Sequence, residues 1–329
     1  MKKIINNPDS VVSECLQGLA LSNPDLIYVP DAEVIAKKLK SDNVGIVSGG
    51  GSGHEPLHAG FVGKGMLDAA VAGNVFSSPS PDRILEGIKQ ADNGKGVLLV
   101  IKNYSGDIMN FELAEEMARM EGSDIDHVIV KDDVAVEDST YSTGRRGIAG
   151  TVFVHKIAGA KAQTGASLPE VKAAAELAIS RIRSMGMAMT PATLPSVGHP
   201  GFELAEDEIE IGMGIHGEPG VNRTKLMTSE ELASELLSFI FDDFDFESSE
   251  VALLINGLGA TPLMELYILN KDVRKILESK GIKVYRSFVG NYTTSLDMSG
   301  CSITLMKLNN ELKSLLDAPC DTSALKIGA

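Results

Sequence analysis

The chain contains no tryptophan and few other aromatic residues, with 10 phenylalanines and 6 tyrosines among 329 residues. Cysteine is scarce as well. Cys15, Cys301 and Cys320 are odd in number and show no C-x-x-C spacing. The sequence therefore indicates neither a disulfide framework nor a thiolate zinc site, and it is typical of thiols in a reducing compartment.

Long apolar runs and positive charge are also lacking. No stretch reaches the roughly 18 apolar residues that a membrane-spanning helix needs, and the N-terminal MKKIINNPDSVV has no apolar core of signal-peptide length. Acidic residues outnumber basic ones by 45 to 30, which gives a net charge of -15 and repels nucleic acids and anionic membranes. We expect a cytoplasmic protein with neither nucleic acid nor membrane as a partner.

What is present describes a glycine-rich α/β chain. Hydrophobic residues make up 43% of the sequence, and 33 residues are glycine. A chain of 329 residues has room for two domains and can bury roughly three quarters of its unfolded surface, so folding should need no metal.

Short β-branched runs alternate with helical periods in the first half of the chain. The runs cover residues 44–50, 96–103 and 127–133, and the helical periods cover residues 109–122 and 171–186. Apolar strands separated by helices predict a mostly parallel sheet that is covered on both faces. Ligand sites in such sheets gather at the carboxyl ends of the strands, where GGGSGHEP and KNYSGD are found.

A proline-rich segment without periodicity, residues 187–201, predicts the domain boundary. We therefore expect an N-terminal α/β domain over residues 1–186 and a smaller C-terminal α/β (α+β) domain over residues 187–329. In the latter, Ser229 should begin a capped helix, and Thr261 should be the N-cap of another helix with Pro262 at its first position.

The stretch GGGSGHEPLHAG (residues 49–60) matches two motifs. HEPLH fits the zinc signature H-E-x-x-H, but Pro56 would interrupt the helix that has to carry both ligands. The glycines suggest a phosphate loop, but a Walker loop would continue with lysine where His54 and Glu55 stand. We therefore predict no metal. What remains is a glycine turn before a helix that Pro56 opens, in which His54 either meets a small ligand or is a structural histidine capped by its neighbours.

A second glycine pattern surrounds His216. Gly212, Gly214 and Gly217 spell the dinucleotide fingerprint G-x-G-x-x-G, but the following Glu-Pro-Gly cannot open the helix that this fingerprint needs. Flanking glycines would leave the His216 ring accessible to a ligand. A structural histidine is the alternative.

The loop after the second strand carries Lys102 and Asp107. Asp107 precedes a predicted helix, where it is either an N-cap or a base that accepts a proton from a hydroxyl. Arg145 and Arg146 could hold an anion, but surface charge is the more common role of such a pair, and we leave them outside the site.

Together these segments resemble the dihydroxyacetone kinase family, and more narrowly its substrate-binding subunit K. The resemblance covers essentially the whole chain. Its main blocks are SGGGSGHEPLHAGFVGKGMLDAAVAG, VFSSPSPD, IKNYSGDIMNFE, GRRGIAGTVFVHKIAGA and EIGMGIHGEPG. The chain shows no segment for a nucleotide-binding domain, so it resembles the bacterial type in which substrate and nucleotide are held by separate subunits.

The resemblance implies a role for each matched residue. His216 would add through a ring nitrogen to the C2 carbonyl of dihydroxyacetone and hold the triose as a hemiaminal. Asp107 would be the acid/base carboxylate, His54 a proton-accepting histidine and Lys102 a substrate contact. The binding loop would comprise Gly51, Ser52 and Gly53.

The reaction implied by the resemblance is phosphoryl transfer to a terminal hydroxyl of dihydroxyacetone. ADP or ATP with Mg²⁺ would stay on subunit L, recharged from phosphoenolpyruvate through the phosphohistidine subunit M, and this chain would bind no cofactor. It would form a homodimer and need its partners for activity. The competing hypothesis is a non-catalytic paralogue that senses dihydroxyacetone and acts as a transcriptional co-activator.

Overall fold

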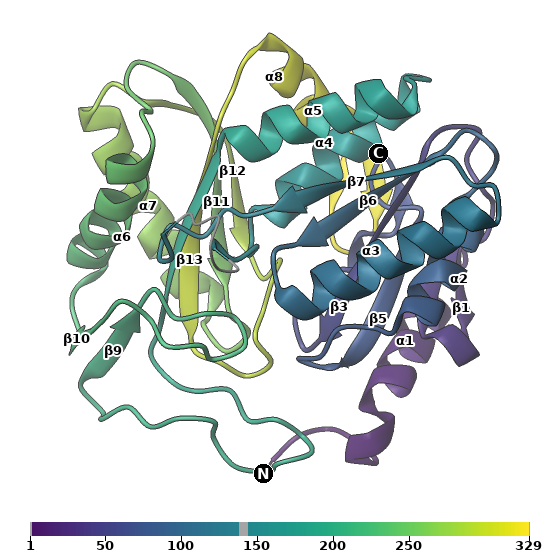
Figure 1. Cartoon of the computed structure of the whole chain (residues 1–329). Coiled ribbons are helices and arrows are strands. Elements are labelled where there is room, and N and C mark those ends of the chain that lie inside the picture. Colours follow the sequence, from purple (N-terminus) through teal and green to yellow (C-terminus); the bar gives the residue numbers. More distant parts are fainter. Residues whose placement is uncertain (1, 138–143, 329) are drawn as a thin grey trace. The chain divides into compact units, whose positions relative to one another are not determined.

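The computed structural model describes residues 2–137 and 144–328, which form two compact units (Figure 1). Of the described residues, the first unit comprises 2–130, 151–180 and 311–328, and the second comprises 131–137, 144–150 and 181–310. These units differ from the predicted division at residue 187. Residues 131–137, 144–150 and 181–186 belong to the second unit, and the C-terminal segment 311–328 belongs to the first.

The first unit contains a six-stranded sheet in the order β1-β2-β5-β3-β6-β7. β5, β3, β6 and β7 are parallel neighbours, whereas β1 and β2 join antiparallel at one edge. The sheet is thus mostly parallel, as predicted. Its strands are β1 (Leu26–Val29), β2 (Val34–Lys37), β3 (Gly45–Ser52), β5 (Ala69–Val75), β6 (Val97–Lys102) and β7 (Ile125–Val130).

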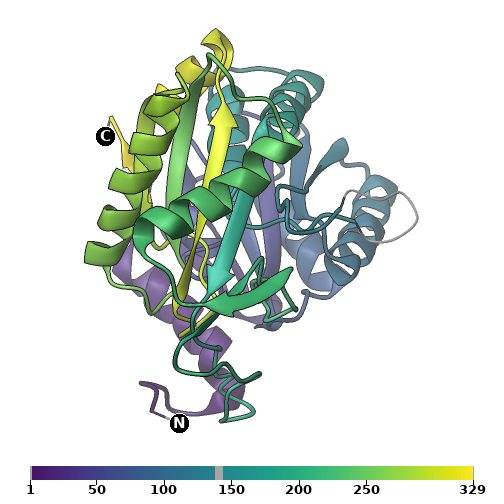
Figure 2. The same cartoon turned by 90° about the vertical axis from the view of Figure 1, so that its left-hand side faces the viewer.

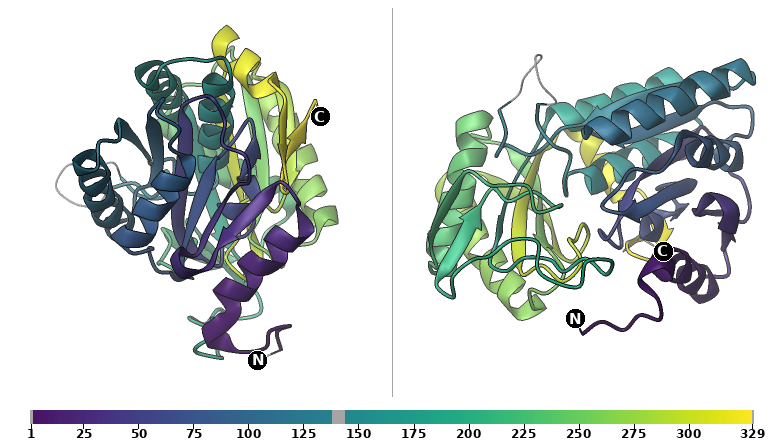
Figure 3. Two further views of the ribbon diagram at one scale, coloured as in Figure 1. Left: turned by 90° about the vertical axis from the view of Figure 1, so that its right-hand side faces the viewer. Right: turned by 60° about the horizontal axis from the view of Figure 1, so that its bottom comes forward.

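Successive side chains of each strand point to opposite faces of the sheet. Because the apolar side chains of the central strands are buried on both faces, helices have to cover the sheet. α2 (Pro81–Ala91) and α3 (Ser105–Met120) lie side by side, with α2 packed against β2, β3 and β5 and α3 packed against β6 and β7 (Figure 1). α4 (Thr151–Gln163) and α5 (Leu168–Ser180) form the other helical pair. α1 (Val11–Ser22) lies beside β1, β2 and β5 (Figure 3, left).

The rest of the first unit consists of short elements. A three-stranded sheet joins the C-terminal segment to the loop after the glycine strand, in the order β15-β14-β4. The elements are β4 (Gly63–Lys64), β14 (Cys320–Thr322), β15 (Lys326–Ile327), α8 (Asn310–Asp317) and the 3₁₀ turns Pro8–Ser10, Pro30–Ala32 and Ala59–Phe61.

The second unit is built on a mostly antiparallel sheet in the order β10-β9-β8-β13-β11-β12, in which only the β11–β12 pair is parallel. α6 (Ser229–Asp243) and α7 (Leu263–Ser279) lie next to each other against it (Figure 2). Its strands are β8 (Ile182–Ala188), β9 (Glu208–Ile211), β10 (Asn222–Lys225), β11 (Glu250–Gly257), β12 (Lys283–Gly290) and β13 (Gly300–Lys307).

The predicted N-caps of α6 and α7 are each wrong by one residue, although α6 begins at Ser229 as predicted. α6 is capped by Thr228, whose hydroxyl accepts from the Glu231 backbone in a capping box, and not by Ser229. The N-cap of α7 is Pro262, and the Thr261 hydroxyl instead donates to the Gly300 carbonyl at 2.6 Å. In both helices the observed N-cap is adjacent to the predicted one. Two residues that can each occupy an N-terminal position are neighbours in both places, Thr228 and Ser229 before α6 and Thr261 and Pro262 before α7.

The predicted helix over residues 171–186 is wrong in its last third. The helix α5 ends at Ser180, and the following residues form β8 between β13 and β9. Pairing with strands distant in the sequence determines this local conformation, so its helical periodicity is overridden. Among the described residues, no helix is both long and apolar enough to cross a membrane.

Candidate functional site

The glycines of GGGSGHEP belong to a strand, which corrects the predicted turn. β3 continues through Gly49, Gly50 and Gly51 to Ser52, paired with β5. A Cβ atom on Gly51 would lie 2.6 Å from the Ser77 backbone nitrogen, so the close approach of the next loop requires glycine here. The chain turns only after Ser52.

The loop that follows the glycine strand holds His54 in a buried position. The ring of His54 is fully buried and stacks on Phe76 with a centroid distance of 5.1 Å. The Ser52 hydroxyl donates to the Gly73 carbonyl at 2.8 Å, and the Gly53 backbone nitrogen donates to the Glu55 carboxylate at 3.1 Å. Gly53 adopts a φ of +102°, which disfavours any side chain.

The HEPLH segment forms a turn, not a helix. Residues 54–58 precede the 3₁₀ turn Ala59–Phe61, so the expectation that Pro56 opens a helix is wrong. His58 contacts Ser48 through its Nδ1 atom at 3.0 Å. A zinc protease needs both histidines on one helical face, so this local geometry does not suit that chemistry.

Lys102 and Asp107 occupy the carboxyl end of β6 and the first turn of α3. Lys102 is fully buried, with its Nζ atom 5.2 Å from the centroid of the Tyr104 ring. Asp107 is also buried, and its carboxylate accepts a hydrogen bond from the Ser78 hydroxyl. The N-cap of α3 is Tyr104, so the alternative that Asp107 caps this helix is wrong.

The segment Phe76–Ser78 connects these side chains within the first unit. It lies against Gly51 through its backbone, stacks on His54 through Phe76 and binds Asp107 through Ser78. The predicted residues of the first unit therefore form one cluster at the carboxyl ends of β3 and β6. Phe76 and Ser78 were missed because they are separated in sequence from the residues they support.

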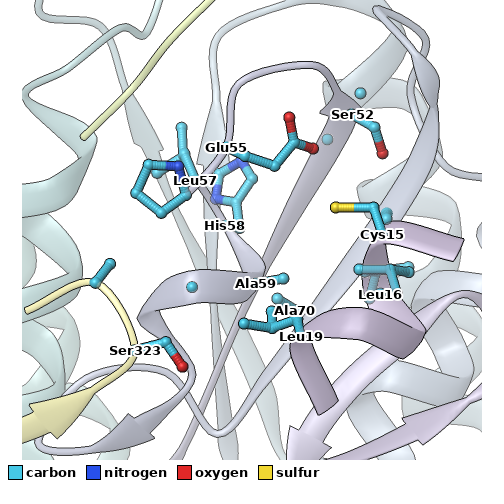
Figure 4. Close-up of a pocket in the computed structure, with 17 residues that line it drawn as sticks. Cys15, Leu16, Leu19, Ser52, Glu55, Leu57, His58, Ala59, Ala70 and Ser323 are labelled. Atoms are coloured by element: carbon cyan, nitrogen blue, oxygen red, sulfur yellow. The ribbon is translucent and has the colours of Figure 1, made fainter. Parts of the chain in front are cut away.

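A cavity of about 370 Å³ lies within the first unit, next to the glycine strand (Figure 4). It is bordered by Cys15, Leu16 and Leu19 of α1 on one side and by Glu55, Leu57 and His58 of the loop on the other. Gly50, Gly51 and Ser52 of β3 line the cavity as well. A Cβ atom on Gly50 would lie 3.3 Å from the Lys102 side chain, so Lys102 lies close to this part of the strand.

His216 lies in a turn of the second unit after β9, and no helix follows it before α6. The dinucleotide fingerprint is thus excluded, as the sequence indicated. The His216 Nδ1 atom lies 2.9 Å from Glu218 Oε1, and the His216 backbone nitrogen donates to Glu218 Oε2 at 2.9 Å. Both carboxylate oxygens of Glu218 therefore hold the same residue.

Glu218 remains ionised in this position. Burial raises the pKa of its carboxyl, but the hydrogen bonds and the electrostatic attraction of His216 outweigh burial and bring this pKa to about 2. An acceptor at Nδ1 places the proton of a neutral imidazole on that nitrogen and leaves the lone pair on Nε2. The His216 side chain is 20% exposed, so this lone pair belongs to an accessible ring.

Arg146 stabilises the turn that contains His216. Its Nε atom donates to Asp133 at 2.8 Å, and its guanidinium also donates to the Gly212 carbonyl at 2.8 Å. A Cβ atom on Gly214 would lie 2.0 Å from the Glu218 carboxylate and 2.6 Å from Arg146, which explains this glycine. Arg145 pairs with Asp243 of α6 instead.

Glu218 was missed by the sequence analysis although it lies two residues from His216. The triplet His-Gly-Glu was its only signal. His216 belongs to the second unit, and the other predicted site residues belong to the first.

One group of metal-ligating side chains occurs in the described part of the chain, and it lies outside the predicted site. Glu115, Asp126 and His127 bring their ligand atoms within 4.8 Å of one another. Arg119 pairs with Glu115 at 2.5 Å, and Lys172 pairs with Asp126 at 2.7 Å. These cations already neutralise the two carboxylates, so the group is an ion-pair network.

Residues 17–324 match the family model described as the Dak1 domain. The chain is 52% identical to the dihydroxyacetone-binding subunit DhaK of PTS-dependent dihydroxyacetone kinase 1 from Listeria innocua, over 98% of this chain and 100% of that protein. It is 54% identical to the corresponding DhaK subunit from Lactococcus lactis, over 95% of this chain and 96% of that protein.

Two further relatives differ in length or described role. The crystal structure of the dihydroxyacetone kinase of C. freundii superposes with a TM-score of 0.92 at 35% identity, covering 99% of this chain and 60% of that one. The DhaKLM operon coactivator DhaQ of Lactococcus lactis is 40% identical, over 94% of this chain and 95% of that protein. The chain belongs to the Dak1 domain family.

Proposed function

We propose that the chain is the dihydroxyacetone-binding subunit of a phosphoenolpyruvate-dependent dihydroxyacetone kinase. The strongest support is the pair formed by His216 and Glu218, because it places an ionised carboxylate at Nδ1 of a partly exposed imidazole. The two DhaK relatives, which are dihydroxyacetone-binding subunits and match nearly the whole chain at more than half identity, support the same function.

In this proposal His216 captures the ketone covalently. The Nε2 lone pair forms a bond to C2, the carbonyl π electrons move to oxygen, and that oxygen takes up a proton to give the hemiaminal. The positive charge that develops on the ring lies against the Glu218 carboxylate, 2.9 Å from Nδ1. Only a carbonyl compound can react in this way, so the pocket would discriminate dihydroxyacetone from glycerol by chemistry and not by shape.

The cluster of the first unit would act on the hydroxyl groups of dihydroxyacetone. Asp107 would take the proton from the terminal hydroxyl as that oxygen attacks the phosphoryl group, and Ser78 orients the carboxylate. His54, Lys102 and the loop Gly51–Gly53 would bind and orient the substrate. Burial of these groups in a water-poor environment strengthens each of these electrostatic interactions.

The phosphoryl donor would be a nucleotide that a partner subunit L holds with Mg²⁺, recharged through the phosphohistidine subunit M. This chain would bind no cofactor of its own, act in the cytoplasm and form a homodimer.

The alternative is a sensor that binds dihydroxyacetone and activates transcription, as the name of DhaQ suggests for that relative. Identity favours the kinase subunit, since it is 52% and 54% to the two DhaK proteins and 40% to DhaQ. Reconstitution with subunit L, its phosphoryl donor chain and phosphoenolpyruvate tests the choice. Dihydroxyacetone phosphate should form only in the complete mixture, and a complete mixture that forms none would overturn the kinase assignment.

A further inference from the structure

Three basic side chains are buried together on the face of the first-unit sheet that α4 covers. Lys102 ends β6, His58 follows the glycine strand, and His155 lies within α4. Lys102 and His155 are fully buried, and His58 is 5% exposed. The rings of His58 and His155 lie 5.3 Å apart. The proposed reaction assigns a role to Lys102 but none to the two histidines.

Ser48 fixes which nitrogen of His58 carries the proton. The Ser48 hydroxyl has one hydrogen, which it donates to the Val100 carbonyl at 2.6 Å. The same oxygen lies 3.0 Å from His58 Nδ1, and it can therefore only accept there. His58 must be the donor, so its proton is on Nδ1 and its lone pair is on Nε2.

The Nε2 lone pair and the lysine ammonium approach the same point above Gly50. A Cβ atom on Gly50 would lie 3.4 Å from His58 Nε2 and 3.4 Å from Lys102 Nζ. Among residues 2–137 and 144–328, Nε2 is buried without a hydrogen-bond partner. The absence of a side chain at Gly50 therefore leaves the imidazole acceptor and the ammonium bordering the same space, and the two atoms make no hydrogen bond to each other.

The surroundings keep this imidazole neutral. Burial lowers the pKa of His58 well below its ordinary value, and the charges of Lys102, His155 and His54 lower it further. Burial and Lys102 also lower the pKa of His155 to about 3. Lys156, the next residue of α4, donates to the Leu315 carbonyl at 2.6 Å. The ammonium of Lys102 is therefore the charge that both imidazoles face.

We propose that His58 is a positioning residue for Lys102: Ser48 fixes its tautomer, and its Nε2 lone pair attracts the lysine ammonium across the space above Gly50 at the carboxyl end of β6. A neutral acceptor suits this task, because a carboxylate would neutralise the charge that the substrate hydroxyl is to meet. His155 packs between His58 and Phe61 and keeps the ring in place. The inference rests on the proposed role of Lys102 as a substrate contact.

Two substitutions of His58 separate its two nitrogens. In His58→Asn the side-chain amide can still donate to Ser48 but offers no acceptor at the position of Nε2. In His58→Gln the longer side chain places an amide oxygen near that position. We expect His58→Asn to raise the KM for dihydroxyacetone about tenfold with kcat changed less than threefold, the scale of one polar interaction with a charged group. His58→Gln should restore KM to within about threefold of the wild type.

A structural role alone would affect both variants in parallel. Equal loss in His58→Asn and His58→Gln, or a fall in kcat without a change in KM, would overturn the positioning role. Thermal unfolding of each variant shows the folded fraction, so that lost activity is not confused with lost protein.

A spectroscopic test does not depend on catalysis. The ¹⁵N NMR shifts of His58 in the whole wild-type chain should show a protonated Nδ1 and an unprotonated Nε2 from pH 8 to pH 5. In Lys102→Met the Nε2 resonance should move, and the ring should take up its proton at higher pH. A proton on Nε2 in the wild type, or no response to Lys102→Met, would contradict the inference even if dihydroxyacetone binds. Correct NMR behaviour in a protein that binds no dihydroxyacetone would instead contradict the proposed function.

Discussion

The two groups of predicted site residues differ in how they are held. In the first unit, His54 and Lys102 are fully buried and Asp107 is nearly so, within a cluster joined by Phe76–Ser78. In the second unit, His216 lies in a glycine-rich turn with a partly exposed ring and one carboxylate partner. Burial suits groups that must orient hydroxyls and move a proton, whereas a nucleophile needs an accessible lone pair.

The two regions need different numbers of supporting contacts. The buried cluster needs many contacts, because each polar group removed from water has to be compensated. The turn needs fewer contacts, because the Glu218 carboxylate binds both the backbone nitrogen and the Nδ1 atom of His216. We therefore expect substitutions to separate proton transfer from ketone capture.

The largest effect should come from Asp107→Asn in the buried cluster. The amide keeps the shape but cannot accept the hydroxyl proton, so turnover in the reconstituted kinase should fall about a hundredfold or more. The covalent adduct should still form. Asp126→Asn, which alters a carboxylate outside the site, is the matched control and should keep normal turnover. Wild-type turnover in Asp107→Asn would show that the buried cluster contains no base.

A smaller effect is expected from Glu218→Gln in the turn. The amide cannot supply the negative charge that holds the His216 proton on Nδ1, so adduct formation should weaken about tenfold to a hundredfold. Titration with dihydroxyacetone, followed by intact-protein mass spectrometry, measures the adduct. The Glu218 carboxyl has a pKa of about 2, so the wild type should show no loss of adduct through Glu218 protonation between pH 8 and pH 4. Unchanged affinity in Glu218→Gln would remove this carboxylate from the capture step.

Gly51→Ala should weaken dihydroxyacetone binding about tenfold. The new Cβ atom would lie 2.6 Å from the Ser77 nitrogen and 2.8 Å from the Phe76 carbonyl carbon, so the supporting segment has to move. Gly18→Ala is the control, because a Cβ atom added at Gly18 would meet no atom within 4 Å. Calorimetric titration of both variants measures the effect. Equal affinities would mean that the segment Phe76–Ser78 does not set the geometry of the cluster.

The smallest effect concerns His127, a histidine outside both groups. The hydrogen bond to Glu115 raises the pKa of His127 against the opposing effect of burial, and the charge of Glu115 adds to this. Protonated His127 therefore stabilises the folded state below its ordinary pKa of about 6.5, and this contribution is lost as pH rises through the raised value.

The melting temperatures of wild type and His127→Gln test this pH dependence. The wild type should be the more stable protein at pH 6, and the difference should shrink towards pH 9. Dihydroxyacetone affinity should be the same in both. A difference in stability that grows with pH would contradict the ion-pair assignment.

Much of the first-unit site could be predicted because the signals are local. Apolar runs located the strands β3, β6 and β7, and the residues after β3 and β6 are the buried ones that gather near each other. The resemblance added roles to them. The cluster's supporting segment could not be predicted, because Ser78 meets Asp107 across 29 residues of sequence.

The remaining errors arise where distant parts of the chain decide the local conformation. Gly49–Gly51 extend β3 because β5 pairs with them, although three glycines alone suggest a turn. Residues 182–186 form a strand because β13 and β9 flank them. The predicted boundary at residue 187 fell inside β8 for the same reason.

The most direct test of the account is a crystal structure of the chain soaked with dihydroxyacetone, with a glycerol soak as the control. We predict continuous density between His216 Nε2 and C2 of the triose, with none joining glycerol to the protein. Density that leaves the triose unattached, or that joins it to His54 or His58, would contradict covalent capture by the exposed turn and with it the division of roles between the two units.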